Sequence, residues 1–155
     1  MSLHAAVRAI RATAAQVAGV VWAPGTVPEQ LTGFPAVIVY PQAGVSRPFA
    51  HASEAGNPVA LGVHTIIVQV HVPWNDLELA TEKLTDFADR VVAALMSAYA
   101  RDQFDGTVLT LGDPRGASSS AAITYQIGPD SWGDNATTTL ALKVSLDVSI
   151  EDEVL

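Results

Sequence analysis

Residues 62–98 constrain the fold of this chain more than any other segment, because a strand pattern runs directly into a helix pattern. From residue 64 to residue 72 the side chains alternate, which is the period of a β-strand with one covered face. Pro73 ends this strand, since proline lacks the backbone N–H that a sheet requires. The face expected to be covered holds Ile66, Val68, Val70 and Val72, and the other holds Thr65, Ile67, Gln69 and His71.

A long amphipathic helix is predicted directly after Pro73. Asn75 or Asp76 is suited to cap its first turn, and Glu78 adds a negative charge where the helix dipole favours one. Apolar residues then recur at steps of three and four, which places them on a single stripe. The stripe consists of Leu77, Ala80, Leu84, Phe87, Val91 and Leu95, and the solvated side consists of Glu78, Glu82, Lys83, Asp86, Asp89 and Arg90.

The sequence before this unit predicts a helix, a surface connection, a strand and an irregular segment. Residues 22–33 hold too many prolines and glycines for regular structure, whereas residues 35–41 are an apolar β-branched run typical of a buried strand. Residues 42–57 predict either a long loop or an irregular hairpin arm, and loops of this length are usually functional or disordered. The first helix is expected from the helical spacing of Leu3, Val7, Ile10, Ala14 and Val17.

The sequence after the long helix predicts only strands and turns. Its last strand shows the clearest alternation, with apolar side chains at every second position from Leu140 to Ile150, so one face is expected to pack and the other to meet water. The elements expected in order are a polar turn at 99–106, a short strand at 107–111, a tight turn at 112–116, a strand at 122–128, a loop at 128–135 and the strand at 140–150.

These elements predict an α+β fold. Strands that alternate so clearly favour a single antiparallel or mixed sheet, with the N-terminal helix and the one long central helix packed on one face. The chain has 155 residues, so residues 1–155 are expected to form a single domain.

Composition narrows the classes of function. Hydrophobic residues make up 49% of the chain and charged residues only 15%, which favours an oligomer that covers apolar surface in its subunit contacts. The net charge is −8 and only two residues are lysines, which argues against tight binding of nucleic acid. No apolar run reaches the roughly 18 residues of a membrane span, and the absence of cysteine excludes thiolate metal sites and disulfides.

Candidate catalytic and metal-binding groups do not form a recognisable site. His64 and His71 lie an odd number of residues apart, so a strand directs them to opposite faces, where they cannot bind one ion together. Residues 118–120 are serines, but no nucleophile-elbow motif surrounds them. The acids Glu78, Glu82 and Asp86 are interleaved with basic residues, as on a solvated helix face. No catalytic residue, metal or cofactor is therefore expected.

Interaction with partners is the function that the remaining features favour. Residues 42–58 and 128–136 are expected to be exposed segments. Aromatic side chains on loops are enriched at protein interfaces. Trp74 and Trp132 could equally pack under their own loops. The candidate partner-contact residues are Arg47, Phe49, His51, Trp74, Asp130, Trp132 and Asp134.

The order of the predicted elements and several sequence segments resemble those of the tail terminator, or tail completion, proteins of long-tailed bacteriophages and related phage-like particles. The resemblance rests on residues 34–41 after an N-terminal helix, a variable loop, residues 64–72 leading into a long helix, and a closing pair of strands. The resemblance covers nearly the whole chain. It rests on the order and character of the segments rather than on an invariant motif. The family has no catalytic residues to carry over.

The resemblance implies a virion protein at the head–tail junction, assembled in the host cytoplasm. Its subunits are expected to close into a homo-oligomeric ring, usually a hexamer, that contacts the tail tube protein and a head-closure or neck protein, while DNA passes through without tight binding. Alternatives are another neck component, such as a head-closure adaptor, a tail-tube subunit, or a small α+β enzyme or ligand-binding domain. Discrete closed rings would indicate a terminator, long tubes would indicate a tail-tube subunit, and bound metal or a thermal shift with divalent ions would indicate an enzyme or ligand-binding domain.

Overall fold

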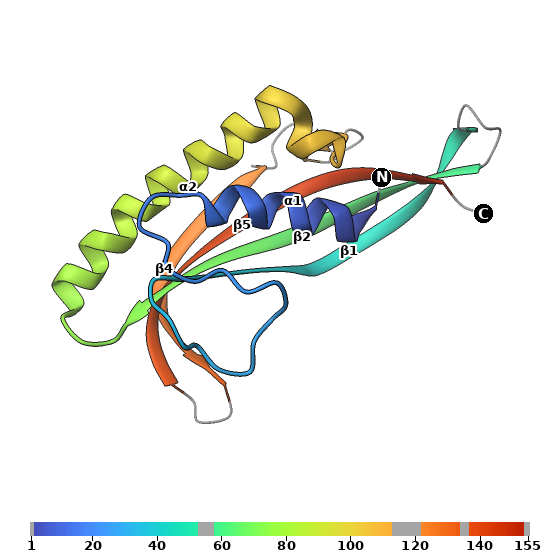
Figure 1. The fold of residues 1–155 in the computed structure, drawn as a ribbon. Helices are drawn as coiled ribbons and strands as arrows, with labels where there is room; N and C mark the ends of the chain where they lie inside the picture. The colour runs from blue at the N-terminus through green and yellow to red at the C-terminus, as the bar shows by residue number, and fades with distance from the viewer. Residues whose placement is uncertain (1, 53–57, 113–121, 134–136, 154–155) are drawn as a thin grey trace.

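A computed structural model describes residues 2–52, 58–112, 122–133 and 137–153. Two helices lie on one face of a long, twisted sheet, and an irregular segment crosses the other face (Figure 1). The predicted α+β class, with both helices on one face, is confirmed. The expected tight turn after Gly112, the serines at 118–120 and Asp134 lie outside the described residues. Within the described ranges, neither helix has the apolar length that a bilayer crossing requires.

The sheet is antiparallel throughout its described ladders. Strand β2 (Pro58–Pro73) lies between β1 (Ala36–Ala52) and β5 (Thr137–Glu153). The far edge of β5 carries both the two-residue β3 (Thr110–Leu111) and the longer β4 (Ile123–Trp132). The unit predicted from residues 62–98 therefore supplies one of the two inner strands.

Both helices begin at the capping residues that sequence favours. In α1 (Leu3–Ala15) the side chain of Ser2 accepts the backbone N–H of Ala5 at 3.1 Å. In α2 (Leu77–Gly106) the cap is Asp76, which accepts the backbone N–H of Leu79 at 3.2 Å. Of the two predicted caps, Asp76 rather than Asn75 therefore starts the long helix.

The main core lies between the helices and the sheet. All four residues predicted on the covered face of β2 are in it, as are the six apolar residues at every second position of β5 from Leu140 to Ile150. Leu77 is the exception on the predicted α2 stripe, with 44% of its surface exposed, because the first turn of α2 extends beyond the end of the sheet (Figure 1). The other five stripe residues are buried: Ala80, Leu84, Phe87, Val91 and Leu95.

The second face of the sheet is also partly covered, which corrects the expectation that it meets water. Ile67, Gln69 and His71 of β2 are buried, and so are Thr139 and Ser149 of β5. The irregular segment before β1 crosses this face, and the end of β4 packs against it (Figure 1). Residues 69 and 71 therefore lie in a small second core rather than on a solvated surface.

The described part of the segment predicted at 42–57, residues 42–52, forms an irregular hairpin arm with β2, the second of the two predicted alternatives, and residues 53–57 lie outside the described residues. Strand β1 continues through it and pairs with β2 as far as Ala52 and Pro58, with register shifts after Pro41 and after Phe49. Prolines are tolerated here because β1 is an edge strand, where a missing N–H on the outer side breaks no ladder bond. The predicted buried strand at 35–41 is thus only the first part of β1.

The loop predicted at 128–135 is wrong over most of its length. Strand β4 runs through Gly128, Pro129 and Asp130 to Trp132, and Pro129 pairs with Leu140. The turn residues suggested a loop, but β4 is an edge strand, so proline and glycine interrupt no further ladder. Asp130 and Trp132 therefore lie on a strand.

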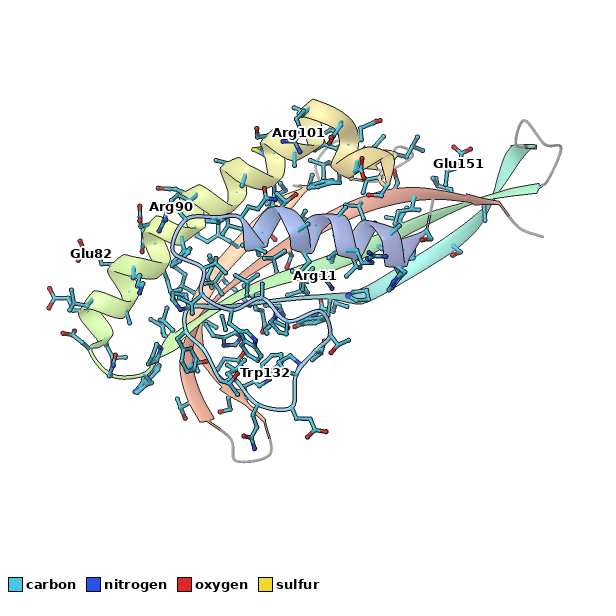
Figure 2. The ribbon with its side chains drawn as sticks, in the orientation of Figure 1. Arg11, Glu82, Arg90, Arg101, Trp132 and Glu151 are labelled. Carbon is cyan, nitrogen blue, oxygen red and sulfur yellow. The ribbon has the colours of Figure 1, made fainter. Side chains whose placement is uncertain are left out.

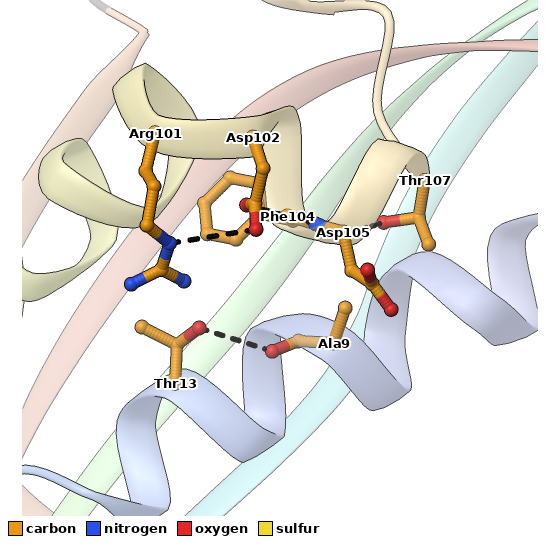
Figure 3. Close-up of polar contacts among 7 residues, drawn as sticks. All are labelled: Ala9, Thr13, Arg101, Asp102, Phe104, Asp105 and Thr107. Carbon is orange, nitrogen blue, oxygen red and sulfur yellow. Dashed lines mark hydrogen bonds and ion pairs between the residues drawn. The ribbon is translucent and has the colours of Figure 1, made fainter.

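The predicted polar turn at 99–106 is partly helix and ends in a left-handed turn. Gln103, Phe104 and Asp105 all have positive φ, as does Gly106. The side chain of Asp102 accepts the backbone N–H of Asp105 at 3.0 Å, and the Thr107 hydroxyl donates to the Phe104 carbonyl at 2.6 Å (Figure 3). This turn directs the Phe104 side chain into the core.

Asp105→Gly is expected to be about 1 kcal/mol more stable than Asp105→Ala, because only glycine adopts the left-handed region without steric cost. Both variants remove the same exposed carboxylate, so their difference isolates the backbone. Urea denaturation followed by circular dichroism measures it. Equal stabilities for the two variants would show that this turn is not left-handed in solution.

Candidate functional site

The predicted contact residues fall in three separate places. Arg47, Phe49 and His51 lie along the distal half of β1, where the structure describes the backbone. Trp74 lies between β2 and α2, at the opposite end of the sheet (Figure 1). Asp130 and Trp132 belong to β4. The sequence therefore identified three regions rather than one site.

The hairpin arm, defined here as residues 41–52 of β1 and 58–65 of β2, projects beyond both helices (Figure 1). Residues 41–46 are all exposed, including Val45 with 56% of its surface accessible. Among the described residues β1 pairs with β2 alone, apart from one bridge between Trp22 and Ala36 at its start. The outer edge of the arm is therefore open to another strand.

His64 is part of the scaffold of this arm. Its ring lies across the backbone of Gly44, its partner in the ladder, and of Gly62 on its own strand. A Cβ atom at Gly44 or Gly62 would collide with the imidazole. His64 and His71 lie on opposite faces, as their odd spacing predicts, so they cannot share a metal ion.

A groove opens where β2 leads into α2. Its volume is about 980 Å³, and its lining includes the apolar residues Phe34, Val72 and Pro73 and the charged residues Asp76, Glu82, Lys83 and Asp86. Trp74 stands beside it with 42% of its surface exposed, and Leu79 on its wall is 62% exposed. The predicted contact residue Trp74 thus belongs to an exposed apolar surface.

Trp132 packs inside its own chain. Its indole N–H donates to the Pro28 carbonyl at 3.0 Å, and its ring meets the edge of His71 with centroids 5.2 Å apart (Figure 2). The next residue, Gly133, lies so close to the Glu29 carbonyl that no side chain fits there. Of the two placements open to Trp132, it adopts the one packed under its own chain.

Beneath Trp132 lies a buried polar cluster that comprises His71, Gln69, Thr139 and Tyr40. Gln69 Nε2 donates to the Tyr40 hydroxyl at 2.9 Å, so Gln69 Oε1 accepts from His71 Nε2–H, also at 2.9 Å. His71 Nδ1 is then left as the acceptor for the Thr139 hydroxyl at 2.8 Å. The hydrogen bonds therefore run in one direction and fix the tautomer of His71.

Burial dominates the electrostatics of this cluster. It lowers the pKa of His71 below its ordinary value, against the smaller opposing effect of the Asp130 carboxylate. Burial followed by the same carboxylate raises the pKa of Tyr40. His71 is therefore kept neutral. The sequence carried one signal of this burial, since Ile67 lies on the same face of the strand as His71.

A polar hollow of about 370 Å³ adjoins the cluster, lined in part by Gln126, Asp130 and Lys143. Within the described ranges, no three histidine or acidic side chains come close enough to hold a metal ion. On α2, Asp86 pairs with Arg90 at 2.9 Å on the exposed helix face.

Neither models of known protein families nor curated protein sequences match this chain.

Proposed function

We propose that this chain is a structural subunit of a closed ring that ends a phage tail tube and offers its other side to the head connector. The open edge of the projecting hairpin arm carries this proposal. Beyond its bridge to Trp22, β1 is an edge strand whose backbone groups, apart from the missing N–H groups of Pro41 and Pro48, are a template for pairing with another chain. A protein with an edge strand either protects that edge from pairing or uses it for assembly.

Two further features support assembly. Only 15% of the residues are charged, and large apolar side chains stand exposed at the start of α2. The arm and the start of α2, which lines the groove, also lie at opposite ends of the sheet (Figure 1), so the molecule carries different surfaces on its two ends. A ring requires two such complementary surfaces on every subunit.

The acidic balance supports a role for the ring as a passage for DNA. With a net charge of −8, each added copy contributes negative charge, and a lumen lined with carboxylates repels phosphates. DNA would then slide through without tight binding. Mapping the charges on an assembled ring tests this part of the proposal, and a basic lumen contradicts it.

The purified chain is expected to form one discrete closed species, with a hexamer as the size implied by the resemblance. Analytical ultracentrifugation gives its mass and electron microscopy its shape. Added to polymerising tail-tube protein, it is expected to bind tube ends and stop growth. A chain that stays monomeric and leaves tube length unregulated overturns the proposal.

The same images separate the alternatives. A tail-tube subunit polymerises into long tubes, whereas a terminator stops at closed rings. A head-closure adaptor also forms rings but binds the connector without capping tubes. Long tubes of the purified chain, or rings that ignore tube ends, would therefore assign it to one of these other components.

A further inference from the structure

The sheet has a second open edge on the side opposite β1. Among the described residues β4 pairs with β5 alone, so its outer edge is unpaired. Residues 124–126 of β4 are all exposed, as are residues 41–46 of β1. Alternate residues of a strand point to opposite faces, so consecutive exposed residues show that neither face is covered there. We call these two stretches the β4 edge segment and the β1 edge segment.

The two edge segments carry little of what protects an edge strand from pairing. Charged side chains, above all lysine, together with proline and β-bulges are the usual protection. Neither segment contains a charged residue. Pro41 and the register shift that follows it lie at the start of the β1 edge segment, and residues 43–46 come after both. Val45 and Tyr125 expose 56% and 61% of their surfaces on these segments. Both edges are therefore suited to pairing with another strand.

The strand directions allow the two edges to meet in an unbroken sheet. Across the sheet the order is β1, β2, β5 and β4, and every neighbouring pair is antiparallel. Strands β1 and β4 therefore run in opposite directions. A copy related to the first by rotation about an axis broadly along the strands keeps these directions. Its β4 then meets β1 of the first copy as an antiparallel neighbour.

The faces of the two strands limit which residues can oppose one another. Val45 is the ladder partner of Val63, which alternation places on the same face of β2 as Ile67. Thr124 lies on that face too, because its partner Ser145 is in turn the partner of Ile67. A joint that keeps each face continuous therefore places Val45 opposite Thr124, or opposite a β4 residue two positions away.

The tilt of the strands in a closed sheet selects between these positions. Within one copy the ladders place Thr124 level with Tyr40, and Gln126 level with Ile38. Thr124 opposite Val45 of the next copy is an offset of about 16 Å along the strands over about 19 Å of sheet width. The resulting tilt of about 40° is typical of closed sheets, whereas Gln126 opposite Val45 requires about 50°.

A second β1 is a poorer partner for β1 than β4 is. Two β1 edges related by a two-fold axis form a closed dimer, which leaves both β4 edges unpaired. When β1 pairs with β4 of the next copy and the ring closes, neither edge segment stays open, as in a β-barrel. One repeated contact then covers both edge segments of every copy.

We propose that β1 of one copy pairs with β4 of the next, with Val45 opposite Thr124, so that one antiparallel sheet runs around the ring. This inference rests on the proposed function, because it assigns the contact between neighbouring subunits of the ring proposed there. The contact is heterologous, since it joins two different strands.

Cysteine crosslinking provides the test, because the chain contains no cysteine of its own. A chain that carries both Val45→Cys and Thr124→Cys is assembled and treated with a short bismaleimide. The Cβ atoms of opposed residues lie about 5 Å apart, within reach of the linker. A denaturing gel is expected to show a ladder of covalent species that ends at the copy number of the ring. An equal mixture of the two single variants is expected to yield covalent dimers and nothing longer.

Two further crosslinking results would overturn the proposal. Each single variant treated alone is expected to remain uncrosslinked, so dimers of Val45→Cys by itself would show that two β1 strands meet. Glu78 is exposed at the start of α2, at the other end of the molecule from the arm. A ladder from Val45→Cys combined with Glu78→Cys, but not with Thr124→Cys, would place the arm at the start of α2.

A lysine on the β1 edge gives an independent readout. Val45→Lys is expected to raise the concentration at which half of the chain is assembled by about tenfold or more, because lysine on an edge strand opposes pairing. Val27→Lys is the matched control, since Val27 is 55% exposed and lies outside both edge strands. Circular dichroism confirms that both variants are folded. Equal assembly of the two variants contradicts the proposed contact.

The outcomes separate this inference from the proposed function. If the wild-type chain forms rings and the assembled double-cysteine variant gives no ladder, the subunits meet elsewhere and the ring proposal stands. A ladder from rings that do not bind tube ends supports this contact and assigns the ring to another neck component. A wild-type chain that never assembles overturns both proposals.

Discussion

Phe87→Ala is expected to lower the free energy of unfolding by about 3–5 kcal/mol, the usual cost of removing a buried phenylalanine side chain. The ring is fully buried between α2 and the rest of the core. Its edge approaches Gly19 after α1, and the Arg90 guanidinium carbon lies 4.5 Å from its centroid. This side chain therefore packs α2 against the segment that follows α1, and its removal leaves a cavity there.

Urea denaturation followed by circular dichroism measures this loss. Small domains are stable by about 5–15 kcal/mol, so the variant is expected to unfold at a much lower urea concentration. Met96→Ala is the matched control on the same helix, because Met96 is 54% exposed, and its effect is expected within about 0.5 kcal/mol. Equal losses in the two variants would contradict the placement of the helix.

The sequence predicted which side of α2 packs against the sheet. The buried face of a helix recurs with the helical period, so its apolar residues follow that period. Leu84, Phe87 and Val91 follow that period and are buried. The pattern failed at Leu77, since periodicity identifies a face but not the point at which the sheet beneath it ends. That exposed first turn is also where the groove opens.

Glycine and proline residues led to incorrect loop predictions at both edges of the sheet. Gly128, Pro129 and Asp130 are turn formers, yet they continue β4 because an edge strand tolerates them. The same tolerance extends β1 through Pro41 and Pro48. An edge position is a property of the assembled sheet, so no local reading of these residues reveals it.

The candidate site was predicted only in part for a related reason. The sequence left two placements open for each tryptophan: Trp74 is exposed, whereas Trp132 packs under residues far away in sequence. The irregular segment that covers His71 has no period. Alternation therefore placed His71 on the correct face without showing that the face is covered.

His71→Ala is expected to cost about 3 kcal/mol or more near neutral pH. The substitution opens a cavity under Trp132 and leaves the Thr139 hydroxyl and the Gln69 carbonyl oxygen without their buried partner. Each unsatisfied buried polar group costs about 1–3 kcal/mol. Urea denaturation measures the effect, and His4→Ala, which removes an exposed imidazole outside the cluster, is the control.

The cost of His71→Ala is also expected to depend on pH. Because burial lowers the pKa of His71 in the folded chain, the unfolded chain binds more protons below its ordinary value of 6.5. The stability that neutral His71 contributes is therefore complete above about pH 6.5 and is lost as the pH falls toward the folded pKa. The difference between wild type and His71→Ala should shrink from about pH 7.5 to about pH 5.5.

The direction of this change distinguishes burial from the Asp130 carboxylate as the dominant influence on His71. If Asp130 dominated, the folded chain would hold the extra proton, and the difference between wild type and variant would grow as the pH falls. Asp130→Asn removes the opposing charge and is expected to steepen the loss in the wild-type background. A growing difference would contradict a neutral His71 held by burial beneath Trp132, whereas no effect of Asp130→Asn would show that this carboxylate does not oppose burial.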